Sequence, residues 1–85
     1  MSLEIFNLSN TSDFLGKIDS LDSIRKELET FKSSTGIIID EYGTTRLYFD
    51  HVKLLLELIS KETSDFKGIL KKAVELKIGL LIEGD

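Results

Sequence analysis

Apolar β-branched and aromatic residues are concentrated over residues 36–50, which lie between segments with the period of a helix. Isoleucine occupies positions 37–39, and threonine, leucine and aromatic residues crowd positions 44–49. Branched and aromatic side chains fit the pleated, half-buried surface of a strand. Gly43 lies between the two runs and can take the left-handed conformation that a tight turn requires. The pattern predicts a β-hairpin over residues 36–50.

The length of the loop decides which face each side chain of this hairpin occupies. With a three-residue loop ending at Gly43, Ile37 lies opposite Leu47, and one face of the hairpin is apolar. That face would hold Ile37, Ile39, Leu47 and Phe49. A mixed group would form the other face: Ile38, Asp40, Arg46 and Tyr48. A two-residue loop would instead pair Ile37 with Tyr48. We favour the first register, in which Asp40 and Arg46 can form a cross-strand ion pair.

Two segments on either side of the hairpin repeat apolar residues with the period of a helix. The first is expected to begin at Asp19 or Ser20, either of which can cap it, and to end at Gly36. The second is expected to begin at Asp50 as N-cap and to end near Ser60. Its apolar residues cover most of its circumference, so we expect it to be buried on nearly every side. The stripe of the first helix consists of Leu21, Ile24, Leu28 and Phe31.

A third helix follows, for which Thr63 or Ser64 can serve as the cap. Gly68 lies inside it, at a cost of about 1 kcal/mol relative to alanine, which suggests the close approach of another backbone. The apolar stripe of this helix consists of Phe66, Ile69 or Leu70, Ala73, Val74 and Leu76.

Short apolar runs at both ends of the sequence predict two more strands. The first is Leu3–Leu8, with Leu3 and Ile5 on one side and Phe6 on the other. Residues 9–18 are polar and are expected to form a connector, in which Thr11 or Ser12 could cap one helical turn. The last strand lies within Ile78–Asp85. It would place Leu80 and Ile82 on one side and Leu81 and Glu83 on the other.

The predicted order is strand, helix, strand, strand, helix, helix, strand, which we write βαββ(αα)β. It indicates a single α+β domain over residues 1–85: a small two-layer sandwich with a four-stranded mixed sheet packed by three helices. The plan is ferredoxin-like with a split second helix, or a variant strand order, because the apolar runs 37–39 and 80–82 suit central strands better than edges. Residues 11–18 and 63–70 share five identities in eight positions, but the spacing downstream differs, so a strict duplication is not predicted.

Composition narrows the class of function. The 85 residues include 15 acids and 11 bases, for a net charge of −4, which disfavours nucleic acid or an anionic membrane as the main partner. The absence of cysteine excludes disulfides and thiol chemistry, and with no apolar run of membrane-spanning length we expect a cytoplasmic protein.

Few residues offer catalytic chemistry. His51 is the single histidine and is expected to lie on the surface of the first turn of a helix. Carboxylates end two of the predicted strands, and would converge if these strands were parallel neighbours; this leads to the alternative of a small metal-dependent enzyme. They are Asp40, Glu41, Glu83 and Asp85. A second alternative is nucleic-acid binding through the lysines of the third helix, Lys67, Lys71, Lys72 and Lys77.

The favoured hypothesis is a small, acidic, non-enzymatic module for protein–protein interaction, regulatory or inhibitor-like, which needs no cofactor and no metal. Three helices on one face of a four-stranded sheet would leave the other face open, with an apolar centre and a charged rim. We expect a protein partner or a second copy of the chain there, and neither a membrane nor nucleic acid. The predicted binding residues are Ile38, Asp40, Arg46, Tyr48, Leu81 and Glu83.

Overall fold

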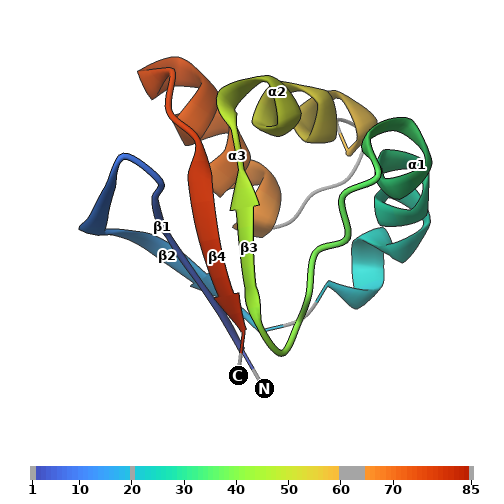
Figure 1. The fold of residues 1–85 in the computed structure, drawn as a ribbon, viewed down its shortest axis with the longest axis horizontal. Helices are drawn as coiled ribbons and strands as arrows, with labels where there is room; N and C mark the ends of the chain where they lie inside the picture. The colour runs from blue at the N-terminus through green and yellow to red at the C-terminus, as the bar shows by residue number, and fades with distance from the viewer. Residues whose placement is uncertain (1, 20, 60–64, 85) are drawn as a thin grey trace.

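A four-stranded antiparallel sheet is the centre of the molecule (Figure 1). The computed structural model describes residues 2–19, 21–59 and 65–84. Along the chain the strands are β1 (Leu3–Asn7), β2 (Asn10–Ile18), β3 (Thr44–Leu47) and β4 (Leu80–Gly84). In the sheet their order is β2-β1-β4-β3. The strand that comes last in the chain therefore lies between β1 and β3.

Three α-helices and one 3-10 turn complete an α+β domain with the order β-β-α-β-α-α-β. The 3-10 turn η1 spans Asp22–Ile24 and leads directly into the first helix. The helices are α1 (Arg25–Thr35), α2 (Phe49–Leu58) and α3 (Asp65–Leu76).

The α+β class is confirmed, but the predicted βαββ(αα)β order and mixed sheet are wrong. All three strand pairings are antiparallel, and the strand order is not the ferredoxin-like one. Two misassigned segments explain the difference. Residues 10–18 form a strand instead of a connector, and residues 36–40 belong to no strand.

Strand β2 is held by its pairing with β1 and not by an apolar pattern of its own. Leu3 pairs with Ile18 and Ile5 with Gly16, after which the register shifts twice before Asn7 meets Asn10. Asparagine side chains tighten the loop, since Oδ1 of Asn7 accepts the N–H of Ser9 at 2.9 Å. The predicted helical turn capped by Thr11 or Ser12 does not form.

The predicted hairpin of residues 36–50 opens into two separate parts. A turn forms at the predicted place, because the Gly43 N–H donates to the carbonyl of Asp40, but the predicted left-handed conformation of Gly43 is wrong: its φ is not positive. Thr44–Leu47 forms β3, but β3 pairs with β4 and not with the isoleucines at 37–39. Those isoleucines form an irregular segment, and Ile37 and Ile39 are half-buried against the core while Ile38 is exposed. The prediction that Ile37 and Ile39 point to one side and Ile38 to the other is therefore confirmed, although the predicted pairing is wrong.

Helix boundaries match the predicted periodicity better than the predicted caps. Leu21, Ile24 and Phe31 are buried, and Gly36 ends α1 in the left-handed conformation (φ 78°), as expected. The cap prediction for Asp50 is wrong, because the N-cap of α2 is Tyr48, two residues earlier, and it makes no side-chain cap bond. Asp19 makes no cap either, since the 3-10 turn has Leu21 in that position. Ser20, Thr63 and Ser64 lie outside the described residues.

Helix α3 buries Phe66, Leu70 and Ala73, which confirms most of its predicted stripe. Leu76 is an exception and is 54% exposed. The expected backbone contact at Gly68 is also wrong, because a Cβ built there would meet nothing within 4 Å. The likeness of residues 11–18 to 63–70 has no structural counterpart, since Asp13–Ile18 is strand and Asp65–Leu70 is helix.

Helices cover only one face of the sheet. In Figure 1, α3 lies behind the strands, α2 lies beyond the upper end of β3, and α1 packs on α2 beyond the edge of β3. The sheet side chains directed toward the helices are buried: Leu3, Ile5, Ile18, Thr45, Leu47, Leu80 and Ile82. The predicted faces of the last strand are confirmed, since Leu81 and Glu83 lie on the opposite side from Leu80 and Ile82. Within the described residues, no helix has the length and apolar character to cross a membrane.

Candidate protein-binding surface

The face of the sheet without helices carries a row of apolar residues on three neighbouring strands, which ends at Arg46 on the fourth. Cross-strand pairing sets Phe14 of β2 beside Phe6 of β1, Phe6 beside Leu81 of β4, and Leu81 beside Arg46 of β3. The rings of Phe6 and Phe14 are 5.5 Å apart in an edge-to-face arrangement. Such pairs are among the favourable aromatic geometries. We call the three residues Phe14, Phe6 and Leu81 the apolar row; Arg46 lies at its end on β3.

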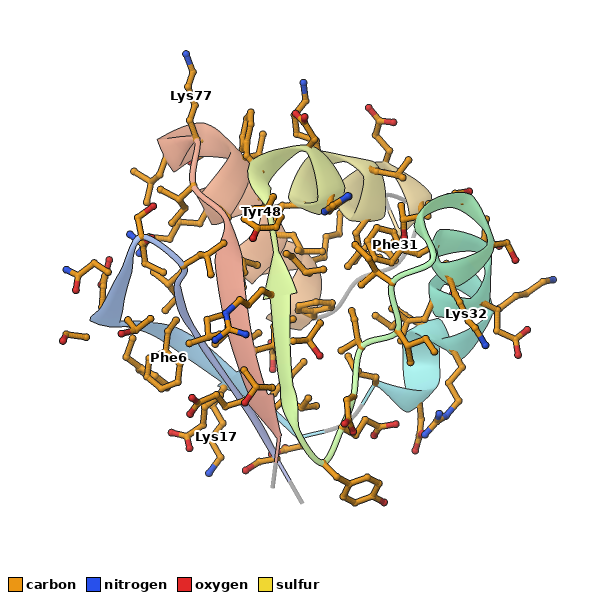
Figure 2. All side chains as sticks on the ribbon, in the orientation of Figure 1. Phe6, Lys17, Phe31, Lys32, Tyr48 and Lys77 are labelled. Atoms are coloured by element: carbon orange, nitrogen blue, oxygen red, sulfur yellow. The ribbon has the colours of Figure 1, made fainter. Side chains whose placement is uncertain are left out.

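Exposure differs along the open face. Phe14 is 52% exposed and Tyr48, which follows β3, is 62% exposed, whereas Leu81 is only 7% exposed. Figure 2 shows Phe6 and Tyr48 on the side of the sheet that faces the viewer, with Lys17 near its lower edge. A partner on this face would meet aromatic rings first, above a leucine that is already nearly covered.

A second row, parallel to the first, carries charges. The register places Lys17 beside Glu4, Glu4 beside Glu83, and Glu83 beside Thr44. Glu4 and Glu83 are like charges in direct opposition, an arrangement that destabilises a sheet. Neither carboxylate makes an ion pair in the part of the chain that the structure describes. Both acids and the flanking lysine are exposed, so the apolar row has a charged rim.

The six predicted binding residues divide into two groups. Arg46, Leu81 and Glu83 lie on the open face, and Tyr48 continues it. Ile38 and Asp40 lie on the segment beside β3, away from the apolar row. Asp40 uses Oδ1 to accept the N–H of Tyr42 at 2.9 Å. Phe14 was missed, because residues 9–18 do not alternate as a strand does, and only its pairing with Phe6 places it on this face.

A groove runs between β3 and the segment that contains Ile38. Arg25 lies at one end and donates to Asp22 at 2.7 Å and to Glu41 at 3.0 Å. The hydrogen bond to Asp22 is the largest cause that raises the pKa of Arg25 above its already high ordinary value, and the charge of Glu41 raises it further. This side chain therefore stays cationic. The predicted ion pair between Asp40 and Arg46 is not formed. The groove is lined by Arg25, Ile38, Ile39, Asp40, Glu41, Tyr42, Thr44, Thr45 and Arg46.

A smaller cavity of about 170 Å³ lies on the other side of the same segment, against α1. It is lined by Arg25, Leu28, Glu29, Lys32, Ile38, Ile39 and Glu41. Ile38 and Ile39 therefore separate two hollows, and the larger one extends to Arg46, the β3 residue beside Leu81.

The predicted convergence of carboxylates depends on parallel strands, and the antiparallel sheet removes that basis. Glu41 is engaged by Arg25, and Asp85 lies outside the described residues. Within residues 2–19, 21–59 and 65–84, no three His, Cys, Asp or Glu side chains are grouped to hold a metal ion.

His51 is half-buried, so its predicted place on the surface is wrong. Its ring packs between those of Phe31 and Tyr48, with centroids 6.4 and 6.2 Å away. The Nδ1 atom is buried and has no hydrogen-bond partner among the described residues. The position is that of a packing residue that links α1 and α2.

The lysines of α3 are spread around its outer surface. Lys71 and Lys72 are exposed, as are the acidic Asp65 and Glu75 on the same helix, and the exposed Lys77 follows its last residue. Acids between lysines weaken the positive field that binding to phosphates requires.

Comparison of the chain with protein-family models, with curated proteins and with solved structures finds no match.

Proposed function

We propose that this chain is a non-enzymatic binding module whose open sheet face receives a protein partner, which is either another protein or a second copy of the chain. The observation that carries the proposal is the apolar row, which spans β2, β1 and β4 on the face without helices. Burying it against a partner would remove apolar surface from water, at about 25 cal/mol per Å².

The composition of the face supports a protein as the ligand. Aromatic side chains and arginine are the residue types most enriched at energetic centres of protein interfaces, and Phe14, Tyr48 and Arg46 are all exposed there. Glu4, Glu83 and Lys17 surround them with charges of both signs. A polar rim around an apolar centre is the usual anatomy of an interface.

Phe14→Ser is the substitution that tests the face. Phe14 is half exposed on an edge strand, so the monomer should remain folded, whereas Leu81 is nearly buried at the centre of the sheet. Loss of an aromatic side chain at the energetic centre of an interface weakens binding by about 2 kcal/mol or more, which corresponds to a dissociation constant raised about thirtyfold or more. The change would be followed by light scattering of the pure chain over a range of concentrations. Titration calorimetry would be used with any partner that the wild-type chain captures.

Leu76→Ser provides the matched control, because Leu76 is as exposed as Phe14 but lies on α3 in the helix layer. It should leave both the solution mass and partner affinity unchanged. Equal effects of the two substitutions, or no effect of Phe14→Ser on any association, would contradict the proposal.

A further inference from the structure

The outer edge of β3 has backbone groups that make no hydrogen bond within the part of the chain that the structure describes. In an antiparallel pair, residues alternate between those whose N–H and C=O point at the neighbouring strand and those whose groups point away. The Gly84 N–H donates to the Gly43 carbonyl at 2.8 Å, and the register continues through Thr44 opposite Glu83. Thr45 and Leu47 are therefore directed at β4. The N–H and C=O groups of Thr44 and Arg46 are directed away from the sheet.

The two edges of this sheet are not equivalent. On the opposite edge, β2 has two irregularities in its register, and such breaks protect an edge from pairing with another chain. The pairing of β3 with β4 has a regular register over its four residues. Thr44 and Arg46 are also exposed.

The groove beside β3 has a second wall with unpaired backbone. Ile38 and Ile39 make no backbone hydrogen bond within the described residues. One bond closes the narrow end of the groove, from the Asp40 N–H to Oγ1 of Thr45 at 3.0 Å. Away from this end, the segment diverges from β3 (Figure 1). The groove thus offers hydrogen-bonding groups on one side and isoleucine side chains on the other.

We propose that this groove binds an extended segment of a partner protein, which adds as a fifth strand to the edge of β3. Main-chain bonds to Thr44 and Arg46 would hold the added strand, and its alternate side chains would contact Ile38 and Ile39. Strand addition of this kind takes most of its affinity from the backbone and its selectivity from side-chain pockets. The site adjoins the open sheet face and shares the side chain of Arg46 with it, but it uses the backbone of β3 and does not depend on the function proposed for that face.

A second copy of the chain fits this edge less well than a separate peptide. Edge-to-edge pairing of two β3 strands would bring a second segment 37–42 to the edge where the first already lies. A register centred on Arg46 would also place two arginines opposite each other, which is unfavourable. An extended peptide brings neither obstacle.

The test uses random 12-residue peptides displayed on phage, selected on the full chain, and the enriched sequences made as synthetic peptides. Amide hydrogen exchange by NMR would then compare free and bound protein. Bound peptide should slow exchange at Thr44 and Arg46 by about tenfold or more, while Thr45 and Leu47, already bonded to β4, change little. Arg46→Pro should lower peptide affinity by about tenfold, because it removes one hydrogen-bond donor from the edge.

Matched variants separate the backbone from the side chain. Proline is tolerated where a strand N–H points away from the sheet, so Arg46→Pro should fold, and circular dichroism checks this. Arg46→Ala keeps the N–H and should retain most of the affinity, whereas Phe14→Ser should have no effect. Failure to enrich any peptide, unchanged affinity in folded Arg46→Pro, or exchange protection confined to other strands would each overturn the proposal. If Arg46→Pro does not fold, the exchange data on the wild-type chain decide alone.

Discussion

Lys77 has a backbone conformation that suits glycine better than lysine. It follows α3 with φ at 56°, and it is the only non-glycine residue with positive φ in the described part of the chain. Its N–H donates to the carbonyl of Val74, and the next N–H, of Ile78, donates to that of Ala73. These two bonds form a Schellman motif, in which the left-handed position is usually glycine.

Replacing this residue should therefore stabilise the protein. Lys77→Gly removes the steric cost of the left-handed conformation, and after the greater flexibility of unfolded glycine a gain of about 0.5–1 kcal/mol is expected. Urea unfolding followed by circular dichroism measures it. Glu75→Gly is the control, since Glu75 is exposed inside α3 and should lose about 1 kcal/mol. A loss of stability in Lys77→Gly would show that the lysine side chain contributes more than the backbone strain costs.

Close backbone contacts decide how the elements fit together. At Gly84, an added Cβ would collide with the carbonyl of Glu41 and approach the backbone nitrogen of Tyr42. The end of β4 is thereby packed directly on the turn that precedes β3. Backbone cannot move aside as a flexible side chain can.

Gly84→Ala should for this reason destabilise the protein by about 1–3 kcal/mol, the usual cost of overpacking. The contrasting variant is Gly68→Ala, on the exposed surface of α3, where nothing lies within 4 Å of an added Cβ. It should gain up to about 1 kcal/mol from helix propensity. Thermal and urea unfolding of both variants provide the comparison, and equal stabilities would show that the turn at Glu41 gives way easily.

Sequence patterns predicted the helices and strands whose own apolar side chains form a buried face. The helices, β1 and β4 were found from their apolar patterns. Each helix has apolar residues at helical spacing, and one of these on each helix is fully buried: Phe31 on α1, Val52 on α2 and Leu70 on α3. Strand β2 was missed because it has no such pattern. Its exposed first half, Asn10–Phe14, is a strand only through its pairing with β1.

The partner of a strand was harder to predict than its existence. Ile37 and Leu47 both reach the core, but Leu47 takes Leu80 as its neighbour and not Ile37. The rules for short hairpin loops favoured Ile37, which is nearer to Leu47 in the sequence. The apolar strand β4 is the partner instead, because it can pair with a strand on each of its edges while helices cover one of its faces. Of the candidate site, Arg46, Tyr48, Leu81 and Glu83 were predicted on one face correctly, and Phe14 was lost along with β2.

The whole domain depends on β4, which is the only strand of the described sheet that contacts both β1 and β3. Leu80 and Ile82 are fully buried between the sheet and the helices. Removal of residues 78–85 should leave β3 with no strand to pair with and separate it from the β1–β2 hairpin. We expect such a chain to lose the dispersed amide spectrum of a folded protein, as measured by NMR. A truncated chain that keeps its dispersed spectrum would mean that the helices and the hairpin form a stable core alone.

The central position of β4 also has a consequence for the speed of folding. Leu3 pairs with Gly84, so nearly the whole described chain lies between two residues that must meet in the middle of the sheet. Contacts between distant residues form slowly, because the loop must close before any stabilising interaction is gained. During synthesis the N-terminal hairpin emerges early, but the sheet cannot be completed until the last strand is available. For that interval β1 and β3 each lack the neighbour that separates them in the native sheet, and the nascent chain is most open to mispairing.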